Sequence, residues 1–185
     1  AYRLAQRAAD SSPRTAAPQV ALSYVHQSRF DLEQARESAR LATELDPRNA
    51  LAWARLAELD LALGERDAAR QAAETATALN PDLARTKTTL GFAQLVRFDT
   101  KESVKSFEQA IKLDQADTLP HLGLGLAMIK RNDLEAGRKQ IEIAASLDPN
   151  NSLIRSYLGK AYYEEKRDPL DGTQFDLAKE LDPRD

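Results

Sequence analysis

The three residues Leu-Asp-Pro, or a close variant of them, recur five times along the chain at a constant spacing of 34 residues. The copies begin at Leu45, Leu79, Leu113, Leu147 and Leu181, and no insertion or deletion separates them. Each copy has the composition of a helix end, because the leucine is a last buried contact and proline cannot continue a helix. Five equally spaced helix ends predict a repeat protein, in which small units stack in a row and each contacts its neighbours.

The spacing also fixes where the repeats begin and end. With the proline at position 32 of each 34-residue repeat, five complete repeats are expected at residues 16–49, 50–83, 84–117, 118–151 and 152–185. Residues 1–15 align with the second half of a preceding repeat. We therefore expect a fragment of a longer array, whose uncapped apolar ends can pack on neighbouring copies.

Two helices are expected in every repeat. The first helix carries leucine at position 7, as Leu22, Leu56, Leu90, Leu124 and Leu158. The second carries alanine at position 27, as Ala42, Ala76, Ala110, Ala144 and Ala178, on one stripe with positions 20, 24 and 30. A short polar turn joins the two, so they must lie antiparallel, and Asp31, Asp67 and Asp133 are candidate N-caps of the second helices.

This pattern resembles the tetratricopeptide repeat. The second repeat carries the family residues Trp53, Leu56 and Ala57, and the last carries Leu158, Gly159, Tyr162, Phe175, Ala178 and Pro183. The resemblance implies an all-α fold, a right-handed α-solenoid of antiparallel helix pairs. The chain departs from the family pattern at Gln115, where proline is usual, and at residues 168–172, where Asp168 is expected as N-cap and Pro169 as first helical residue.

The residue inventory argues against an enzyme. The chain contains no cysteine and two histidines, and both His26 and His121 occupy first-helix positions at which a packing role is expected. No glycine-rich phosphate loop, paired histidine motif or serine elbow is present. We predict no catalytic residue, no metal site and no cofactor.

Charge and hydropathy argue against a nucleic-acid partner and against insertion into a membrane. The formal net charge is −3 and is spread along the chain, which is not the basic footprint of a nucleic-acid-binding protein. No apolar run approaches the length of a membrane span, so direct membrane insertion by this chain is not expected. The absence of cysteine fits both the cytoplasm and the periplasm, which leaves the compartment open.

The resemblance assigns the function to a surface. In this family the first helices line a concave groove that holds a peptide or a helix. Two of the family's groove chemistries are absent here: the lysine–asparagine carboxylate clamp, replaced for example by Val20 and Tyr24, and the asparagine ladder. The expected partner-binding residues are Tyr24, Arg55, Arg85, Phe92, Leu122, Leu126, Lys130, Tyr157 and Lys160.

The helix expected at residues 118–130 is apolar on all faces. We interpret its Leu122 and Leu126, with Phe92 and Tyr157, as apolar anchors for a partner, flanked by basic residues that select an acidic one. On this interpretation, changing Leu122 and Leu126 to aspartate abolishes partner capture and preserves the helices. The alternative is that the array itself covers this face.

The predicted function is a protein-interaction scaffold that binds a partner peptide or helix in the concave groove. Two alternatives stay open at this point. One is a structural spacer or self-assembly module of a larger, envelope-associated multidomain protein. The other is the accessory array of an enzyme whose catalytic domain lies outside this chain.

Overall fold

The computed structural model describes residues 2–166 and 170–182, and all of its regular elements are α-helices. The chain divides into two compact units, of which the first ends at Arg97 and the second begins at Phe98. The first contains α1 (Tyr2–Ser11), α2 (Ala16–Ser28), α3 (Leu32–Leu45), α4 (Ala50–Leu63), α5 (Arg66–Leu79) and α6 (Ala84–Val96). The second contains α7 (Thr100–Leu113), α8 (Thr118–Lys130), α9 (Leu134–Leu147), α10 (Ser152–Glu164) and α11 (Leu170–Leu181). The expected cap at Asp168 and Pro169, and Pro183, lie outside the described residues.

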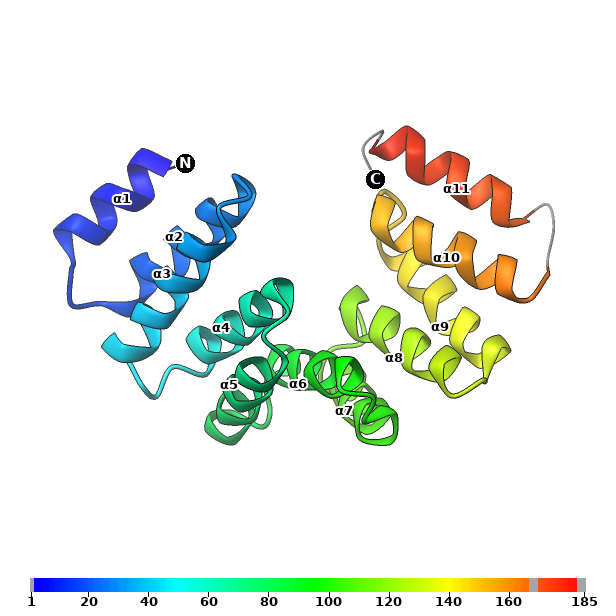
Figure 1. Cartoon of the computed structure of the whole chain (residues 1–185), viewed down its shortest axis with the longest axis horizontal. Coiled ribbons are helices and arrows are strands. Elements are labelled where there is room, and N and C mark those ends of the chain that lie inside the picture. The colour runs from blue at the N-terminus through cyan, green and yellow to red at the C-terminus, as the bar shows by residue number, and fades with distance from the viewer. Residues whose placement is uncertain (1, 167–169, 183–185) are drawn as a thin grey trace. The chain divides into compact units, whose positions relative to one another are not determined.

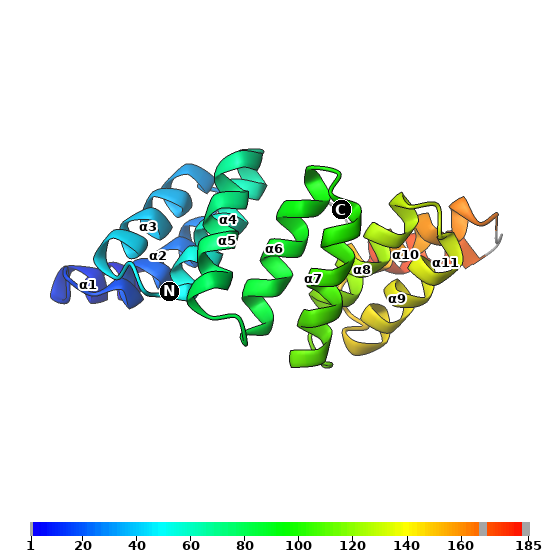
Figure 2. The same cartoon turned by 90° about the horizontal axis from the view of Figure 1, so that it is seen from below.

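Consecutive helices pack side by side within each unit. Figure 1 shows the hairpins α2–α3 and α4–α5 in the first unit and α8–α9 and α10–α11 in the second. Seen from below in Figure 2, α3 lies next to α4 and α9 next to α10, so within each unit one hairpin packs on the following one. The predicted all-α architecture of packed helix pairs is confirmed.

The alanine stripe of the second helices lies in the core of the hairpins. Ala42, Ala76, Ala110 and Ala144 are all completely buried. A second stripe position holds Ala39 and Ala73 in the first unit, and the larger Phe107 and Ile141, also completely buried, in the second.

A glycine compensates for the larger side chain in the second unit. A Cβ added to Gly123 of α8 would lie 2.3 Å from the ring of Phe107, which is inside van der Waals contact. The missing side chain thus makes the room that the ring occupies. Side-chain volume is traded between facing helices so that the core stays close-packed.

The turn inside each hairpin places one residue in the left-handed region. These residues are Phe30, Gly64, Phe98, Asn132 and Lys166, one in each repeat at the same position, with φ between 55° and 82°. Glycine and asparagine adopt this conformation readily, whereas phenylalanine is strained by its Cβ. Phe30 is also 84 % exposed, so little packing offsets the strain.

We expect replacement of Phe30 by glycine to stabilise the first unit, because it removes the left-handed strain from an exposed side chain. Phe30→Gly should exceed Phe30→Ala by about 1 kcal/mol in free energy of unfolding, since alanine keeps the Cβ that causes the strain. Urea unfolding followed by the fluorescence of Trp53, the chain's one tryptophan, measures the difference. Equal stability of the two variants would show that the turn is not strained.

The caps of the second helices agree with the sequence in part. Asp31 and Asp133 occupy the N-cap positions of α3 and α9, and the Asp133 carboxylate accepts a hydrogen bond from the Ala136 N–H at 3.4 Å. The prediction for Asp67 is wrong, because α5 begins at Arg66 and its N-cap is Glu65. The N-cap directly follows the left-handed residue of the turn, so Glu65 after Gly64 is the counterpart of Asp31 and Asp133, and Asp67 lies two residues further on.

Candidate protein-binding surfaces

In the first unit, the first helices of three successive repeats meet in one polar network. Arg55 of α4 is the centre of this network and is 2 % exposed. Its guanidinium donates hydrogen bonds to Ser23 Oγ at 2.9 Å and to Gln27 Oε1 at 2.7 Å, both on α2. The guanidinium carbon also lies 3.8 Å from the centroid of the Tyr24 ring, within the range of a cation–π contact.

Arg85 of α6 joins the same network from the other side. Its Nε and Nη2 donate to the two carboxylate oxygens of Glu58 on α4 at 2.9 and 2.8 Å, a bidentate pair. Arg85 also donates to the Tyr24 hydroxyl, and Glu58 accepts from Arg55 at 3.2 Å. Burial opposes the charge, but the hydrogen bonds with Glu58 outweigh it, so the pKa of Arg85 is raised and the guanidinium stays charged.

The network separates two roles among the residues that the sequence pattern selected. Tyr24 is 39 % exposed and the side chain of Arg85 is equally accessible, so both can contact a partner. Arg55 is buried, and its contacts instead fix the position of the Tyr24 ring. Glu58, which the predicted set omits, holds both arginines; its position on the same face as Tyr24 is the sequence signal that could have included it.

Phe92 of α6 is half-buried on the first unit. The second unit carries the remaining predicted residues. Leu126 of α8 and Tyr157 of α10 are half-buried and pack on one core cluster. Lys160 is exposed, and the exposed Lys130 places its ammonium nitrogen 4.1 Å from the centroid of the Phe98 ring.

Leu122 is a core residue and not an accessible anchor. Its side chain is 3 % exposed and belongs to the cluster that contains Ile141 of α9 and Ile154 and Leu158 of α10. The following hairpin thus covers this side of α8, as the alternative interpretation of the sequence holds. Leu122 is therefore not part of the proposed surface. Its change to aspartate is expected to disrupt the helices and not to preserve them.

Residues 2–166 and 170–182 contain neither a metal-binding cluster nor a membrane-spanning helix. This part of the chain contains no group of three acidic or histidine side chains that could hold a metal ion. None of its helices combines the length and the apolar character that crossing a bilayer requires.

Comparison with known proteins shows which fold these helices form. A family model of the tetratricopeptide repeat matches residues 50–83, the range of α4 and α5. The solved structure of TTC0263, a thermophilic tetratricopeptide-repeat protein of Thermus thermophilus, is similar with a TM-score of 0.85 over 92 % of this chain and 93 % of that chain, at 19 % identity. The fold is that of a tetratricopeptide-repeat protein.

Two further solved structures are similar to this chain. The pilF protein of Pseudomonas aeruginosa has a TM-score of 0.73 over 90 % of this chain and 76 % of that chain, at 21 % identity. YrrB, a tetratricopeptide-repeat protein with an unusual peptide-binding site, has a TM-score of 0.62 over 99 % of this chain and 94 % of that chain, at 18 % identity. No curated protein sequence matches the chain. At these identities the structural comparisons establish the fold.

Proposed function

We propose that this tetratricopeptide-repeat chain is a protein-interaction scaffold that binds an acidic peptide or helix along the first helices of its repeats. Proteins of this fold generally act as protein-interaction scaffolds. One observation carries the proposal for this chain. Tyr24 and Arg85 come from positions 61 residues apart, and the repeat between them holds both on one accessible surface through Arg55 and Glu58.

The charges of the network favour an acidic partner. Two arginines and one glutamate leave a net charge of +1 at this surface, which a carboxylate of the partner neutralises. The half-exposed guanidinium of Arg85 can share its donors between Glu58 and that carboxylate. The Tyr24 ring beside it adds apolar area and a hydroxyl, and tyrosine and arginine are among the residue types enriched at the positions that dominate binding energy.

Fixed positions of these side chains reduce the entropy lost on binding. Arg55 is held by hydrogen bonds to Ser23 and Gln27, and its guanidinium lies against the Tyr24 ring. The ring therefore already occupies one orientation before a partner arrives. In the second unit, we assign the same role to Leu126 and Tyr157, which pack on one core cluster, and to the exposed Lys160.

The test compares two arginines that lie on different helices but have similar exposure and a similar ion-pair partner. Arg85 on α6 and Arg70 on α5 are each partly exposed and each paired with a glutamate, Glu58 and Glu74 respectively. Peptides selected from a random displayed library against the wild-type chain should be rich in aspartate and glutamate. Arg85→Ala should weaken their binding about tenfold or more, whereas Arg70→Ala should leave it unchanged within about twofold.

Fluorescence anisotropy of labelled selected peptides measures these affinities. Equal binding to both variants would place the peptide elsewhere and contradict the proposal. A library that yields no binder to the wild-type chain would also contradict it, and would favour the spacer or self-assembly alternative.

A further inference from the structure

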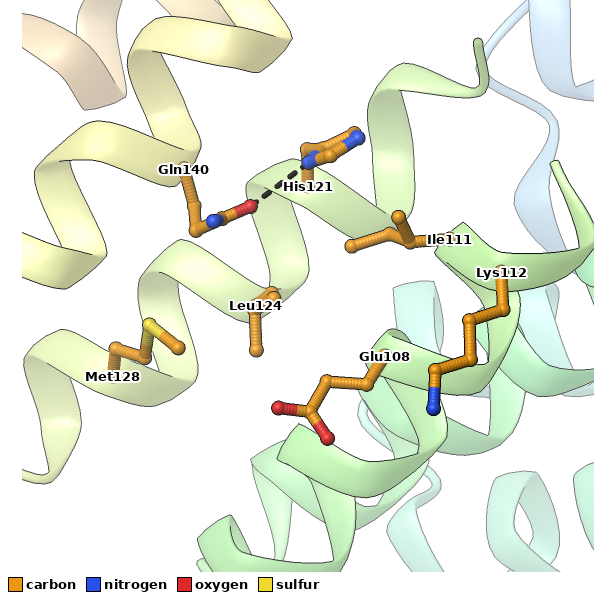
Figure 3. A pocket seen from close by; sticks show the side chains of 7 residues that line it. All are labelled: Glu108, Ile111, Lys112, His121, Leu124, Met128 and Gln140. Atoms are coloured by element: carbon orange, nitrogen blue, oxygen red, sulfur yellow. Dashed lines mark hydrogen bonds between the residues drawn. The ribbon is translucent and has the colours of Figure 1, made fainter. Parts of the chain in front are cut away.

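A pocket in the second unit lies on the side of α8 that the proposed partner surface does not use. It has a volume of about 440 Å³ and lies between α7, α8 and α9. In Figure 3, Leu124 and Met128 of α8 face Glu108, Ile111 and Lys112 of α7, and His121 and Gln140 close the upper side. Leu124 and Leu126 point to different sides of the helix because they are two residues, or about 200°, apart. The pocket is therefore separate from the surface that contains Leu126.

The same pocket is built again one repeat later. A second pocket of about 370 Å³ is lined by Glu142, Ala145, Ser146, Pro149, Arg155, Leu158, Tyr162 and Gln174. Apart from Pro149, these residues are the counterparts, 34 positions on, of the seven that line the first pocket. Two pockets at equivalent positions follow from the geometry of the repeat and not from a local packing defect.

The first unit shows what this geometry accommodates. The counterpart of His121 and Arg155 in the second repeat is Trp53, which packs on the core cluster of that unit. Its indole N–H donates to the backbone oxygen of Pro47 at 3.0 Å. The facing residue is the small Ala72, where the second unit has Gln140. In the second repeat, the side chain at this position is thus an indole ring that packs on the core of its own chain.

The two pockets of the second unit differ in how far side chains of the chain itself already fill them. Arg155 donates to the Pro149 oxygen at 3.1 Å, the role that Trp53 plays, and to Gln174 at 3.0 Å. The Tyr162 hydroxyl donates to Glu142 at 2.6 Å across the same pocket. In the first pocket the shorter His121 pairs with Gln140 at 2.9 Å, and the apolar Met128 takes the place of the tyrosine. The pocket beside His121 is the larger and the more apolar of the two.

We propose that the pocket beside His121 receives the indole ring of a tryptophan side chain from a partner protein. Ile111, Leu124 and Met128 supply the apolar contact, and methionine contacts aromatic rings favourably. The carboxylate of Glu108 is an acceptor at the rim for the indole N–H. This second binding surface stands or falls independently of the acidic-partner surface of the first unit.

The chain provides its own reporter for the test, because Met128 is its one methionine. A chain labelled with ¹³C at the methionine methyl gives one signal, which lies in the pocket. N-acetyl-tryptophanamide, added as the probe, should shift this signal upfield in a saturable way with a Kd of roughly 1 mM, the range of a single side chain. N-acetyl-alaninamide at the same concentrations should not.

Variants with an internal ring separate this pocket from other sites. His121→Trp should fill the pocket from within, as Trp53 does in the second repeat, and abolish the response to the probe. Arg155→Trp, the same change in the neighbouring pocket, should leave the response intact. His121→Ala, which opens the pocket, should bind the probe at least as well as wild type and guards against misfolding of the tryptophan variant.

The contrary results are equally definite. An unsaturable or absent Met128 shift in the wild-type chain would overturn the proposal. So would a response in His121→Trp equal to that of the wild type, because the probe would then be bound outside this pocket.

Discussion

Replacing Leu122 by aspartate is expected to unfold the second unit. The leucine side chain is 3 % exposed and lies in a cluster with Ile141, Ile154 and Leu158. A carboxylate at this place finds no partner in that apolar cluster, so its charge must be buried unpaired or the helices must separate. We expect a loss of about 4 kcal/mol or more in free energy of unfolding, which is comparable to the total stability of a small domain.

The control for this variant lies three residues earlier on the same helix. Leu119 is 47 % exposed and sits in the first turn of α8, where a negative charge interacts favourably with the helix dipole. Leu119→Asp should therefore change stability by less than about 0.5 kcal/mol.

The two units have separate reporters for this experiment. The methyl signal of Met128 reports on the second unit, and the fluorescence of Trp53 reports on the first. In Leu122→Asp the methyl signal should move to the position of an unfolded chain, and the emission of Trp53 shows how far the unfolding extends. A Leu122→Asp chain as stable as Leu119→Asp would return Leu122 to the accessible surface.

Leu122 also marks the limit of what the sequence can predict. The periodicity of the sequence predicts the helix, the hairpin and the side of the helix on which Leu122 lies. It does not say whether the next hairpin packs on that side, because burial depends on how closely two neighbouring repeats approach. Ile154 and Leu158, which share its cluster, are 32 and 36 residues away in the sequence.

The network around Arg55 shows the same division. The shared face of Tyr24, Arg55 and Arg85 follows from their positions in successive first helices. That Arg55 is buried beneath Tyr24, and Arg85 is not, depends on the reach of a flexible side chain to Ser23 and Gln27. Such contacts have no periodic signal. The pocket beside His121 has a weak signal in the sequence, because one repeat position changes from tryptophan at Trp53 to histidine at His121. This change can be interpreted only once the structure shows how the side chain of Trp53 packs.

A close approach between α8 and α9 yields a second large effect, through Gly125 of α8. A Cβ added to this glycine would lie 2.7 Å from the backbone oxygen of Gly137 on α9 and 2.6 Å from Ile141. The reciprocal Cβ on Gly137 would lie 2.7 Å from the oxygen of Gly125. Small residues at the equivalent positions of other repeats, such as Ala57 and Ala69 in the second, predict this close packing of the two helices from the sequence. The sequence does not reveal how near the backbones of Gly125 and Gly137 lie.

Gly125→Ala is therefore expected to destabilise the second unit by about 3 kcal/mol, even though alanine favours helix more than glycine does. A backbone oxygen cannot rotate away as a side chain can, so α8 and α9 must move apart and loosen the contacts of Ile141. Gly172 of α11 is the matched control, because a Cβ there meets no atom within 4 Å. Gly172→Ala should stabilise the chain by about 0.5 kcal/mol, since only the helix preference remains. Urea unfolding followed by the Met128 methyl signal and by helical circular dichroism measures both variants. Opposite signs for the two substitutions would identify the close backbone approach as the cause, whereas a stabilising Gly125→Ala would mean that these helices lie further apart than the structure places them.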